Sequence, residues 1–282
     1  MVTSPPLSQL SYGALIQGRV QMIEGKLQYH IRGLLTNSPC IDSANIASKA
    51  LTIAIRYALV RRQFSAAPSA PETKLMDYVI HQHRLLPLLA QTFAFYFTGK
   101  EVRKLYTNLM NKLNTYKPDE NKADLAAIVE VLKETHSTSA GLKAFTTWGC
   151  LHTIEQCRQT LGGHGYSKYS GLSVMYNDFA VQCTWEGDNT ILMLQLGRYL
   201  ISSYREALEG KTHPAGLAYM NNRNPVYACK AMNREDFADP DLIQQAYDIV
   251  SLATVKDAAT EHKTALKNGK REDQAMEVCC KL

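Results

Sequence analysis

The sequence predicts an all-α protein, an antiparallel helical bundle, on three observations. Apolar residues recur at steps of three and four along most of the chain, which is the spacing of a helix with one buried face. Ser38-Pro39 and Asp239-Pro240 are helix-start signals, because the first residue can cap free backbone N–H groups and proline suits the first helical position. Alternating patterns of useful strand length are absent.

The expected helices follow one another with short polar connections. The helix that begins at Pro39 is expected to end near Phe64, and the next one to begin at Glu72 and to kink at Pro87. Gly99 is expected inside that helix, since the apolar pattern continues past it. The inward face of the helix that begins at Glu72 is expected to hold Leu75, Val79, Leu86, Ala90 and Phe93. The other expected helical segments are 9–35, a stretch from 125, 139–161, 172–181, 190–207, 240–267 and 272–282.

Composition and charge exclude several classes of protein. The 282 residues are 45% hydrophobic and 20% charged, an ordinary globular balance in a chain long enough to bury a core. The net charge of +5 is modest and no dense Lys/Arg run is present, so we expect no nucleic-acid binding. No apolar run reaches the roughly 20 residues of a transmembrane helix. Seven irregularly spaced cysteines fit reduced thiols in an intracellular protein better than a disulfide framework.

No metal site is expected from the cysteines and histidines. On a helix, Cys150 and Cys157 share a face but lie ~10.5 Å apart along the axis, too far to bind one ion. His152 points away from both, and His81 and His83, two residues apart, also diverge.

The stretch 156–198 holds the candidate site. A helical pattern stops at Gly162 and Gly163, and Gly165 follows. Glycines let a backbone adopt positive φ and approach a bulky ligand, whereas a helix C-cap explains one or two of them and three poorly. About twenty residues later, Glu186 stands between an indole and a glycine at a helix start. It is either a base beside a large flat cofactor or an acid that interacts with the helix dipole.

Three short segments carry a family resemblance. Residues 159–166 (Gln-Thr-Leu-Gly-Gly-His-Gly-Tyr) and 185–190 (Trp-Glu-Gly-Asp-Asn-Thr) resemble the C-terminal helical domain of the acyl-CoA dehydrogenase superfamily. The Glu-Gly-Asp-Asn-Thr form looks like the acyl-CoA oxidases in particular. Residues 56–64 (Arg-Tyr-Ala-Leu-Val-Arg-Arg-Gln-Phe) are a further match, in the right order and about a hundred residues upstream.

The resemblance implies a reaction and a catalytic residue. Acyl-CoA would be oxidised to trans-2-enoyl-CoA, with FAD taking a hydride and O₂ being reduced to H₂O₂. Glu186 would be the base that removes the proton next to the thioester, while hydrogen-bond donors stabilise the charge on the thioester oxygen. An apolar pocket with Trp185 at its side would raise the pKa of that carboxylate towards the working pH.

The resemblance also implies which residues bind FAD. Gln159, Gly162 and Gly163 would contact the adenosine-diphosphate part of a FAD bound mainly by a neighbouring subunit, as in a homodimer. Arg61 would reach the pyrophosphate, which suits its planar guanidinium. The remaining expected cofactor residues are Gln63 and Phe64, beside Arg61, and Asp188 and Thr190, near the ribityl or diphosphate region.

Purely structural roles remain alternatives for several of these residues. The Arg61-Arg62 pair can be a solvated basic helix end, an interpretation that applies best to Arg62. Asp188 can cap the helix that follows. In the family a glycine usually follows the phenylalanine, whereas Ser65 stands here, which puts the turn and the Arg61 contact in question.

The family's domain plan implies that much of an oxidase lies outside this sequence. We expect the helical bundle at 1–205 and an incomplete second helical domain at 206–282. The upstream helical and β-barrel domains of acyl-CoA oxidases are not in the sequence, so the chain is interpreted as an internal fragment or short product. The alternative is a non-catalytic helical dimerisation module. Cys280-Lys281-Leu282 is similar to a peroxisomal address, or is an accidental ending.

Overall fold

The structure, a computed structural model, describes residues 39–65, 67–115, 122–213, 215–222 and 231–279. By its internal contacts the chain divides into two compact units, 1–189 and 190–282. The described residues form α-helices, short 3₁₀ helices and loops, and their isolated β-bridge joins Arg62 and Lys74. The prediction of an all-α fold is confirmed for this part of the chain.

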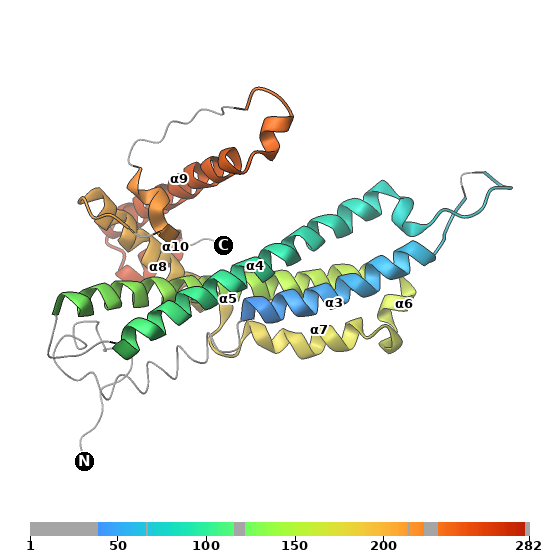
Figure 1. The fold of residues 1–282 in the computed structure, drawn as a ribbon, viewed down its shortest axis with the longest axis horizontal. Coiled ribbons are helices and arrows are strands. Elements are labelled where there is room, and N and C mark those ends of the chain that lie inside the picture. Colours follow the sequence, from blue (N-terminus) through green and yellow to red (C-terminus); the bar gives the residue numbers. More distant parts are fainter. Residues whose placement is uncertain (1–38, 66, 116–121, 214, 223–230, 280–282) are drawn as a thin grey trace, which may run out of the picture. The chain divides into compact units, whose positions relative to one another are not determined.

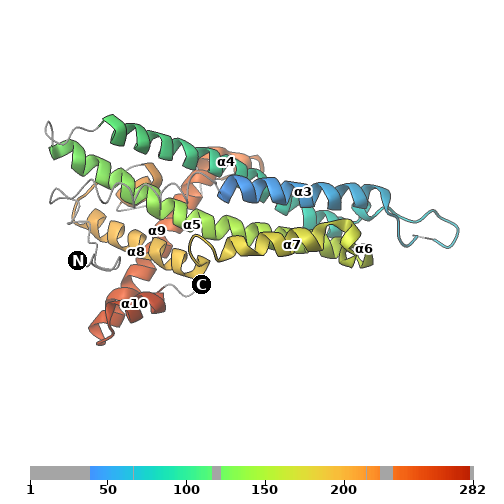
Figure 2. The ribbon, with the colours of Figure 1, turned by 90° about the horizontal axis from the view of Figure 1, so that it is seen from below.

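The first unit is built on three long helices, α3 (Pro39–Val60), α4 (Val79–Thr115) and α5 (Lys122–Thr160). Figures 1 and 2 show α3 alongside both of the others, and these three helices contact one another pairwise. After α5 the chain turns back through α6 (Gly163–Tyr166), and α7 (Leu172–Ala180) then runs along α5. Three single-turn 3₁₀ helices, at 75–77, 168–170 and 181–183, connect these elements.

Small residues let the three long helices approach closely. A Cβ built on Gly99 of α4 would lie 2.6 Å from Ile41 Cγ1 of α3, and one built on Gly149 of α5 would lie 2.5 Å from Phe95 Cζ of α4. Gly99 is inside its helix, as predicted. The main core of this unit consists of Ala47, Ala50, Leu51 and Ala54 of α3, Leu85 of α4, Cys150, Ile154 and Cys157 of α5, Leu161, and Leu172 and Phe179 of α7.

Three predicted helix boundaries are wrong. Helix α3 ends at Val60 and not near Phe64, because the chain there pairs with a later segment: Gln63 N donates to the Thr73 carbonyl over 2.9 Å. Helix α4 begins at Val79 and not at Glu72, since residues 72–74 belong to that pairing. The two stretches expected around 125 and 139 are one continuous helix, α5.

The predicted inward face of α4 is also wrong. Val79, Leu86 and Phe93 are 78%, 48% and 58% exposed. The face that packs on the bundle is instead made by Leu85, Thr92, Phe95, Gly99, Val102 and Leu109. Helix α4 therefore has apolar residues on two faces, and periodicity alone does not tell which of the two is covered within one chain.

The second unit contains most of α8 (Asn189–Leu208), followed by α9 (Pro240–Lys267) and α10 (Glu272–Cys279). Two 3₁₀ segments, Ala215–Asn221 and Glu235–Ala238, lie in the irregular region expected after residue 210. Asp239 caps α9 as predicted, because its side chain accepts a hydrogen bond from Asp241 N over 2.9 Å. A buried residue, His262, joins this unit's helices: its Nδ1 lies 2.7 Å from an Arg205 nitrogen.

Candidate active site and cofactor contacts

Glu186 lies in a tight turn with unusual backbone geometry. Its φ is +56°, and that of the next residue, Gly187, is +117°. Among the described non-glycine residues, Phe64 and Glu186 are the two with positive φ, and both are predicted site residues. A side chain in this region costs on the order of 1–3 kcal/mol, so such a residue persists only where its surroundings enforce it.

A buried lysine, Lys143, binds the turn through two hydrogen bonds. Lys143 of α5 is 1% exposed, and its Nζ donates to the Gly187 carbonyl over 2.8 Å and to Asn189 Oδ1 over 2.7 Å. Asn189 is equally buried, and its Nδ2 donates to Thr147 Oγ1 over 2.9 Å. The segment 187–189, after Glu186, is therefore tied to the middle of α5 by a polar network shielded from water.

Two electrostatic effects on the pKa of Glu186 oppose one another. Desolvation raises the pKa of its carboxyl, and the positive charge of Lys143 lowers it, with a net upward shift. Desolvation in turn lowers the pKa of Lys143, against the negative charges of Glu186 and Asp188. A carboxyl with a raised pKa that is exposed at a surface is suited to general base chemistry near neutral pH. Trp185 beside it is 51% exposed, and its Nε1 donates to Gln182 over 2.9 Å.

The glycine turn after α5 has one residue that the chain's own packing does not require. Gly162 has φ +59° and ψ −134°, which a residue with a side chain rarely adopts. A Cβ on Gly165 would lie 1.8 Å from the Arg158 carbonyl oxygen. A Cβ on Gly163 would meet nothing within 4 Å, and Gly163 is exposed. Open space at Gly163 fits the close approach of a ligand from outside this chain.

The amide of Gln159 is oriented by neighbouring side chains. Arg84 of α4 donates through Nε to Gln156 over 2.7 Å and through NH2 to Gln159 Oε1. Gln159 Nε2 donates to Glu155 over 2.8 Å. Hydrogen bonds from Arg158 lower the pKa of Glu155 to about 2, although burial acts in the opposite direction. Glu155 is therefore ionised at neutral pH.

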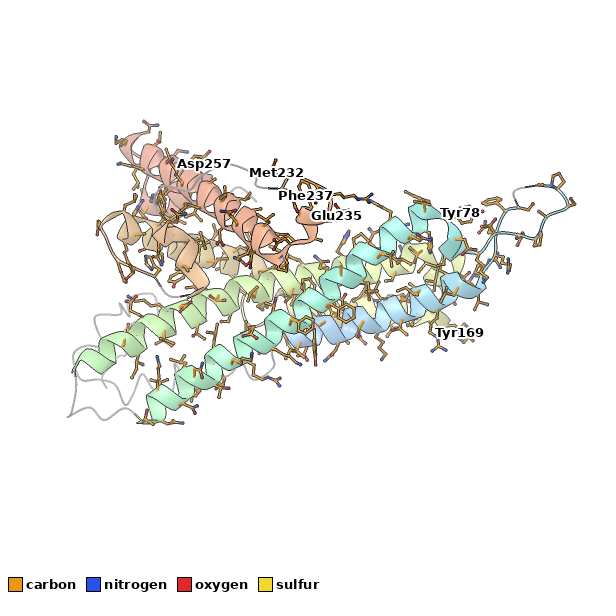
Figure 3. The ribbon with its side chains drawn as sticks, turned by 45° about the horizontal axis from the view of Figure 1, so that its top comes forward. Tyr78, Tyr169, Met232, Glu235, Phe237 and Asp257 are labelled. Atoms are coloured by element: carbon orange, nitrogen blue, oxygen red, sulfur yellow. The ribbon has the colours of Figure 1, made fainter. Side chains whose placement is uncertain are left out.

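The segment after α3 presents a free guanidinium. Arg61 is exposed and its side chain has no hydrogen-bonding or ionic partner among the described residues, whereas Arg62 NH1 donates to the Glu72 carbonyl over 2.8 Å. The Tyr78 hydroxyl donates to the Gln63 carbonyl over 2.8 Å and supports the turn from the start of α4 (Figure 3). Phe64 is 71% exposed with φ +59°. The residue with the glycine-like backbone is thus Phe64 and not Ser65.

The fold brings two of the three motif segments together and keeps the third apart. The Tyr57 hydroxyl, one turn before Arg61, lies 2.9 Å from His164 Nδ1, so the end of α3 adjoins the glycine turn. The Glu186 turn is attached at Lys143, sixteen residues before Gln159 on the same helix. At a rise of 1.5 Å per residue this is a separation of ~24 Å along α5.

Sequence reasoning missed three residues of these sites, Lys143, Asn189 and Arg84. Lys143 had a readable signal: it is the single Asp, Glu, Lys or Arg residue between Glu134 and Glu155. A lysine is almost never fully buried unless it is paired, so a lone lysine in a long uncharged helical run marks a position where burial would need a partner. Arg84 had no such signal, because its partners lie more than seventy residues away.

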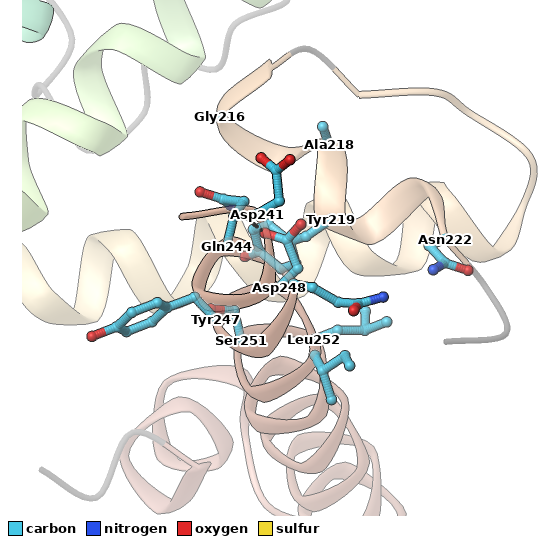
Figure 4. Close-up of a pocket in the computed structure, with 12 residues that line it drawn as sticks. Gly216, Ala218, Tyr219, Asn222, Asp241, Gln244, Tyr247, Asp248, Ser251 and Leu252 are labelled. Atoms are coloured by element: carbon cyan, nitrogen blue, oxygen red, sulfur yellow. Dashed lines mark hydrogen bonds between the residues drawn. The ribbon is translucent and has the colours of Figure 1, made fainter. Parts of the chain in front are cut away.

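Other candidate sites contain none of the predicted residues. In the second unit a cavity of about 570 Å³ is lined by polar side chains, such as Asp241 and Asp248, and by apolar ones, such as Leu252 (Figure 4). Among the described residues no cluster of three His, Cys, Asp or Glu could hold a metal ion.

No described helix is both long and apolar enough to span a membrane. Cys280-Lys281-Leu282 lies outside the described residues.

Comparison with known proteins shows the family. Residues 38–201 match the acyl-CoA oxidase C-alpha1 domain. The chain is 42% identical over 277 residues to acyl-coenzyme A oxidase 2 of Yarrowia lipolytica, covering 98% of this chain and 37% of that protein. It is 35% identical over 261 residues to peroxisomal acyl-coenzyme A oxidase 1 of Bos taurus, covering 91% of this chain and 38% of the relative.

A solved structure gives the same result. The structure of acyl-CoA oxidase-1 of Caenorhabditis elegans, complexed with FAD and ATP, superposes with a TM-score of 0.74 at 29% identity, covering 87% of this chain and 36% of that one. The chain thus spans less than two fifths of the length of the relatives that it matches. On the family match and the identity over nearly its whole length, the chain belongs to the acyl-CoA oxidase family.

Proposed function

We propose that this chain is the C-terminal helical part of an FAD-dependent oxidase that converts acyl-CoA to trans-2-enoyl-CoA and reduces O₂ to H₂O₂. The observation that carries the proposal is Glu186: an exposed carboxylate with a raised pKa, held at φ +56° by a network anchored in α5. A structure maintains strain of this kind where the position of one group matters.

In the proposed reaction Glu186 acts as the base. Its carboxylate takes the proton from the carbon next to the thioester, and the electron pair of that C–H bond becomes the new double bond. The neighbouring carbon loses its hydrogen as hydride to FAD, the chemistry that the cofactor supplies when bound. The raised pKa makes the Glu186 carboxylate a better proton acceptor, and the positive charge of Lys143 limits that rise.

The residues present fit FAD. The free Arg61 guanidinium suits a pyrophosphate, and the open space at Gly163 suits close backbone contact. Gln159 would bind the adenosine-diphosphate part through its oriented amide, with Gly162 providing the turn. We place Gln63 and Phe64 beside Arg61, and Asp188 and Thr190 near the ribityl or diphosphate region.

We further propose that one FAD site is shared by two subunits of a homodimer. The ~24 Å along α5 between the attachment of the Glu186 turn and Gln159 is compatible with this arrangement. One chain would provide Glu186 to its own site and the glycine turn to the site of its partner. The domain boundary near residue 205 and a peroxisomal location remain proposals, the second supported by a relative that is named peroxisomal.

The base assignment is tested in a complete oxidase, in which this chain replaces the matching segment of Yarrowia lipolytica acyl-coenzyme A oxidase 2. We expect Glu186→Gln in this grafted oxidase to lower acyl-CoA turnover at least about a thousandfold, as expected for loss of the base in a step that has no substitute. The flavin absorbance should remain, because the amide keeps the size of the side chain. Substantial turnover in a flavin-loaded variant would contradict the assignment.

The second candidate is a non-catalytic helical module that pairs with complete subunits. The exposed apolar stripe of Val79, Leu86 and Phe93 on α4 favours it. The two candidates are distinguished by mixing the purified chain with complete subunits and recording the flavin spectrum and the substrate turnover of the mixed oligomers. Only the catalytic candidate predicts that the flavin sites sharing this chain turn over substrate.

A further inference from the structure

Lys143 is an expensive residue to bury. Its side chain is 1% exposed in the middle of α5, and removing an ammonium group from water costs several kcal/mol unless partners replace the water. An apolar side chain would fill the same space between the helices without that cost. Both hydrogen bonds of Lys143 go to the segment 187–189, so its position is explained by the turn and not by packing in the bundle.

The turn needs such an anchor. Glu186 and Gly187 both have positive φ, and Glu186 would relax to an ordinary backbone conformation if it were free to do so. The carbonyl of Gly187 and the side chain of Asn189 lie after the strained residue, and Lys143 binds both of them. Before it, the amides of Thr184 and Trp185 donate to the Val181 carbonyl over 3.0 and 3.1 Å.

The same ammonium acts on the charge of Glu186. The ionisable groups that face Lys143 electrostatically are Cys183, Glu186 and Asp188, all on the segment above it. Lys143 is in turn the charged group that lowers the pKa of Glu186 against desolvation. One buried group therefore has two effects, on the position of the carboxylate and on its ionisation.

We propose that Lys143 is a positioning residue for the reaction: through its hydrogen bonds to Gly187 and Asn189, its buried ammonium holds Glu186 in the strained backbone conformation that aims the carboxylate. This inference rests on the proposed function of Glu186 as the base. It assigns no contact with substrate or cofactor to Lys143 itself.

The test uses two substitutions and one control in the grafted oxidase. Lys143→Met removes charge and donors at similar length, and Lys143→Gln removes the charge while leaving an amide donor. The control is Lys133→Met, the same change on the same helix at a half-buried lysine that pairs with Glu130 over 3.0 Å. The pH dependence of kcat/KM and the values of kcat and KM are measured for each.

The expected result has a defined sign. Without the ammonium, desolvation of Glu186 is unopposed, so the pKa of the base rises and the acid limb of kcat/KM moves to higher pH in both Lys143 variants. In Lys143→Met, kcat also falls about 10- to 100-fold, because the carboxylate is misplaced, while KM changes less. Lys133→Met should leave the acid limb of kcat/KM and the value of kcat unchanged.

A second measurement does not depend on activity. Amide hydrogen exchange over residues 184–189 is followed in the chain of 282 residues and in its Lys143→Met variant. We expect exchange at least about tenfold faster in the variant, because both hydrogen bonds from the Lys143 ammonium to this segment are lost, and no change in Lys133→Met.

The outcomes separate the two proposals. If Lys143→Met leaves both the acid limb and the exchange unchanged, or lowers only the melting temperature, Lys143 is a structural residue and the inference is overturned. If Glu186→Gln retains turnover, the base assignment fails instead. Faster exchange would then still show the anchor, without a catalytic role for it.

Discussion

The three glycines after α5 differ in what the fold requires of them. Gly162 is required by its own backbone conformation and Gly165 by the nearby Arg158 carbonyl. Gly163 has no requirement within the chain, because a Cβ there meets nothing within 4 Å. A sequence motif therefore combines residues that serve the fold with a residue that is free to serve a ligand.

This difference predicts opposite effects of one substitution at two positions. Gly165→Ala should lower the free energy of unfolding of the chain by about 2–4 kcal/mol, since the Cβ meets backbone that cannot move cheaply. Gly163→Ala should leave the stability unchanged or slightly higher, and should weaken FAD binding in the grafted oxidase about tenfold or more. Urea unfolding and flavin titration measure the two effects. Normal flavin affinity in Gly163→Ala would refute a cofactor contact at this residue.

At the scale of elements, close contact between α3 and α4 sets the spacing of the bundle. Gly99 lies against Ile41, with the prospective Cβ 2.6 Å from Ile41 Cγ1 and 3.1 Å from Ile41 N. The helices are thereby held at a distance that only a residue without a side chain allows. The face of α5 that carries Lys143 is placed by the same packing of three helices.

Gly99→Ala should destabilise the chain by about 1–2 kcal/mol. Overpacking costs about 1–3 kcal/mol, and the higher helix propensity of alanine returns up to about 1 kcal/mol of it. Ile41→Ala removes the atom that the new methyl meets, so the double variant should be less destabilised than the sum of the two single changes. Denaturant unfolding of all four proteins checks this. Strictly additive effects would mean that the two helices separate freely.

At the scale of the whole molecule, α4 has an apolar face that the described residues leave exposed. Val79, Leu86 and Phe93 are seven residues apart in succession and well exposed. Isolated exposed apolar residues are common, but a row along one helix is typical of an interface. We propose that this row packs against further protein chain or against a second copy of this chain.

The chain alone should therefore self-associate and bind FAD weakly or not at all, since half a site keeps the cost of ordering the ligand and loses most contacts. Leu86→Glu combined with Phe93→Glu should shift it towards monomer in sedimentation velocity. Phe237→Glu, which changes an aromatic residue that is 67% exposed in the second unit (Figure 3), should not. A yellow, monodisperse monomer before any substitution would contradict both expectations.

What the sequence determined by itself was local or chemical in nature. Helical periodicity, the Asp239 cap and the glycine stops are properties of short segments, so they identify the helices and their all-α arrangement. Residue type and spacing singled out Gly162 and Glu186, whereas the roles proposed for Arg61, Gly162 and Glu186 come from the family resemblance and remain proposals. A lone Lys143 in an uncharged run was visible too, but its partner was not.

The tertiary structure decided everything that depends on contacts between distant segments. It ended α3 at Val60, where pairing with residues 73–74 replaces the helix, and it chose which apolar face of α4 is buried. It joined Tyr57 to His164 and Lys143 to the Glu186 turn, while separating that turn from Gln159 along α5. Periodicity describes one helix at a time, and these features are set by which helix packs against which.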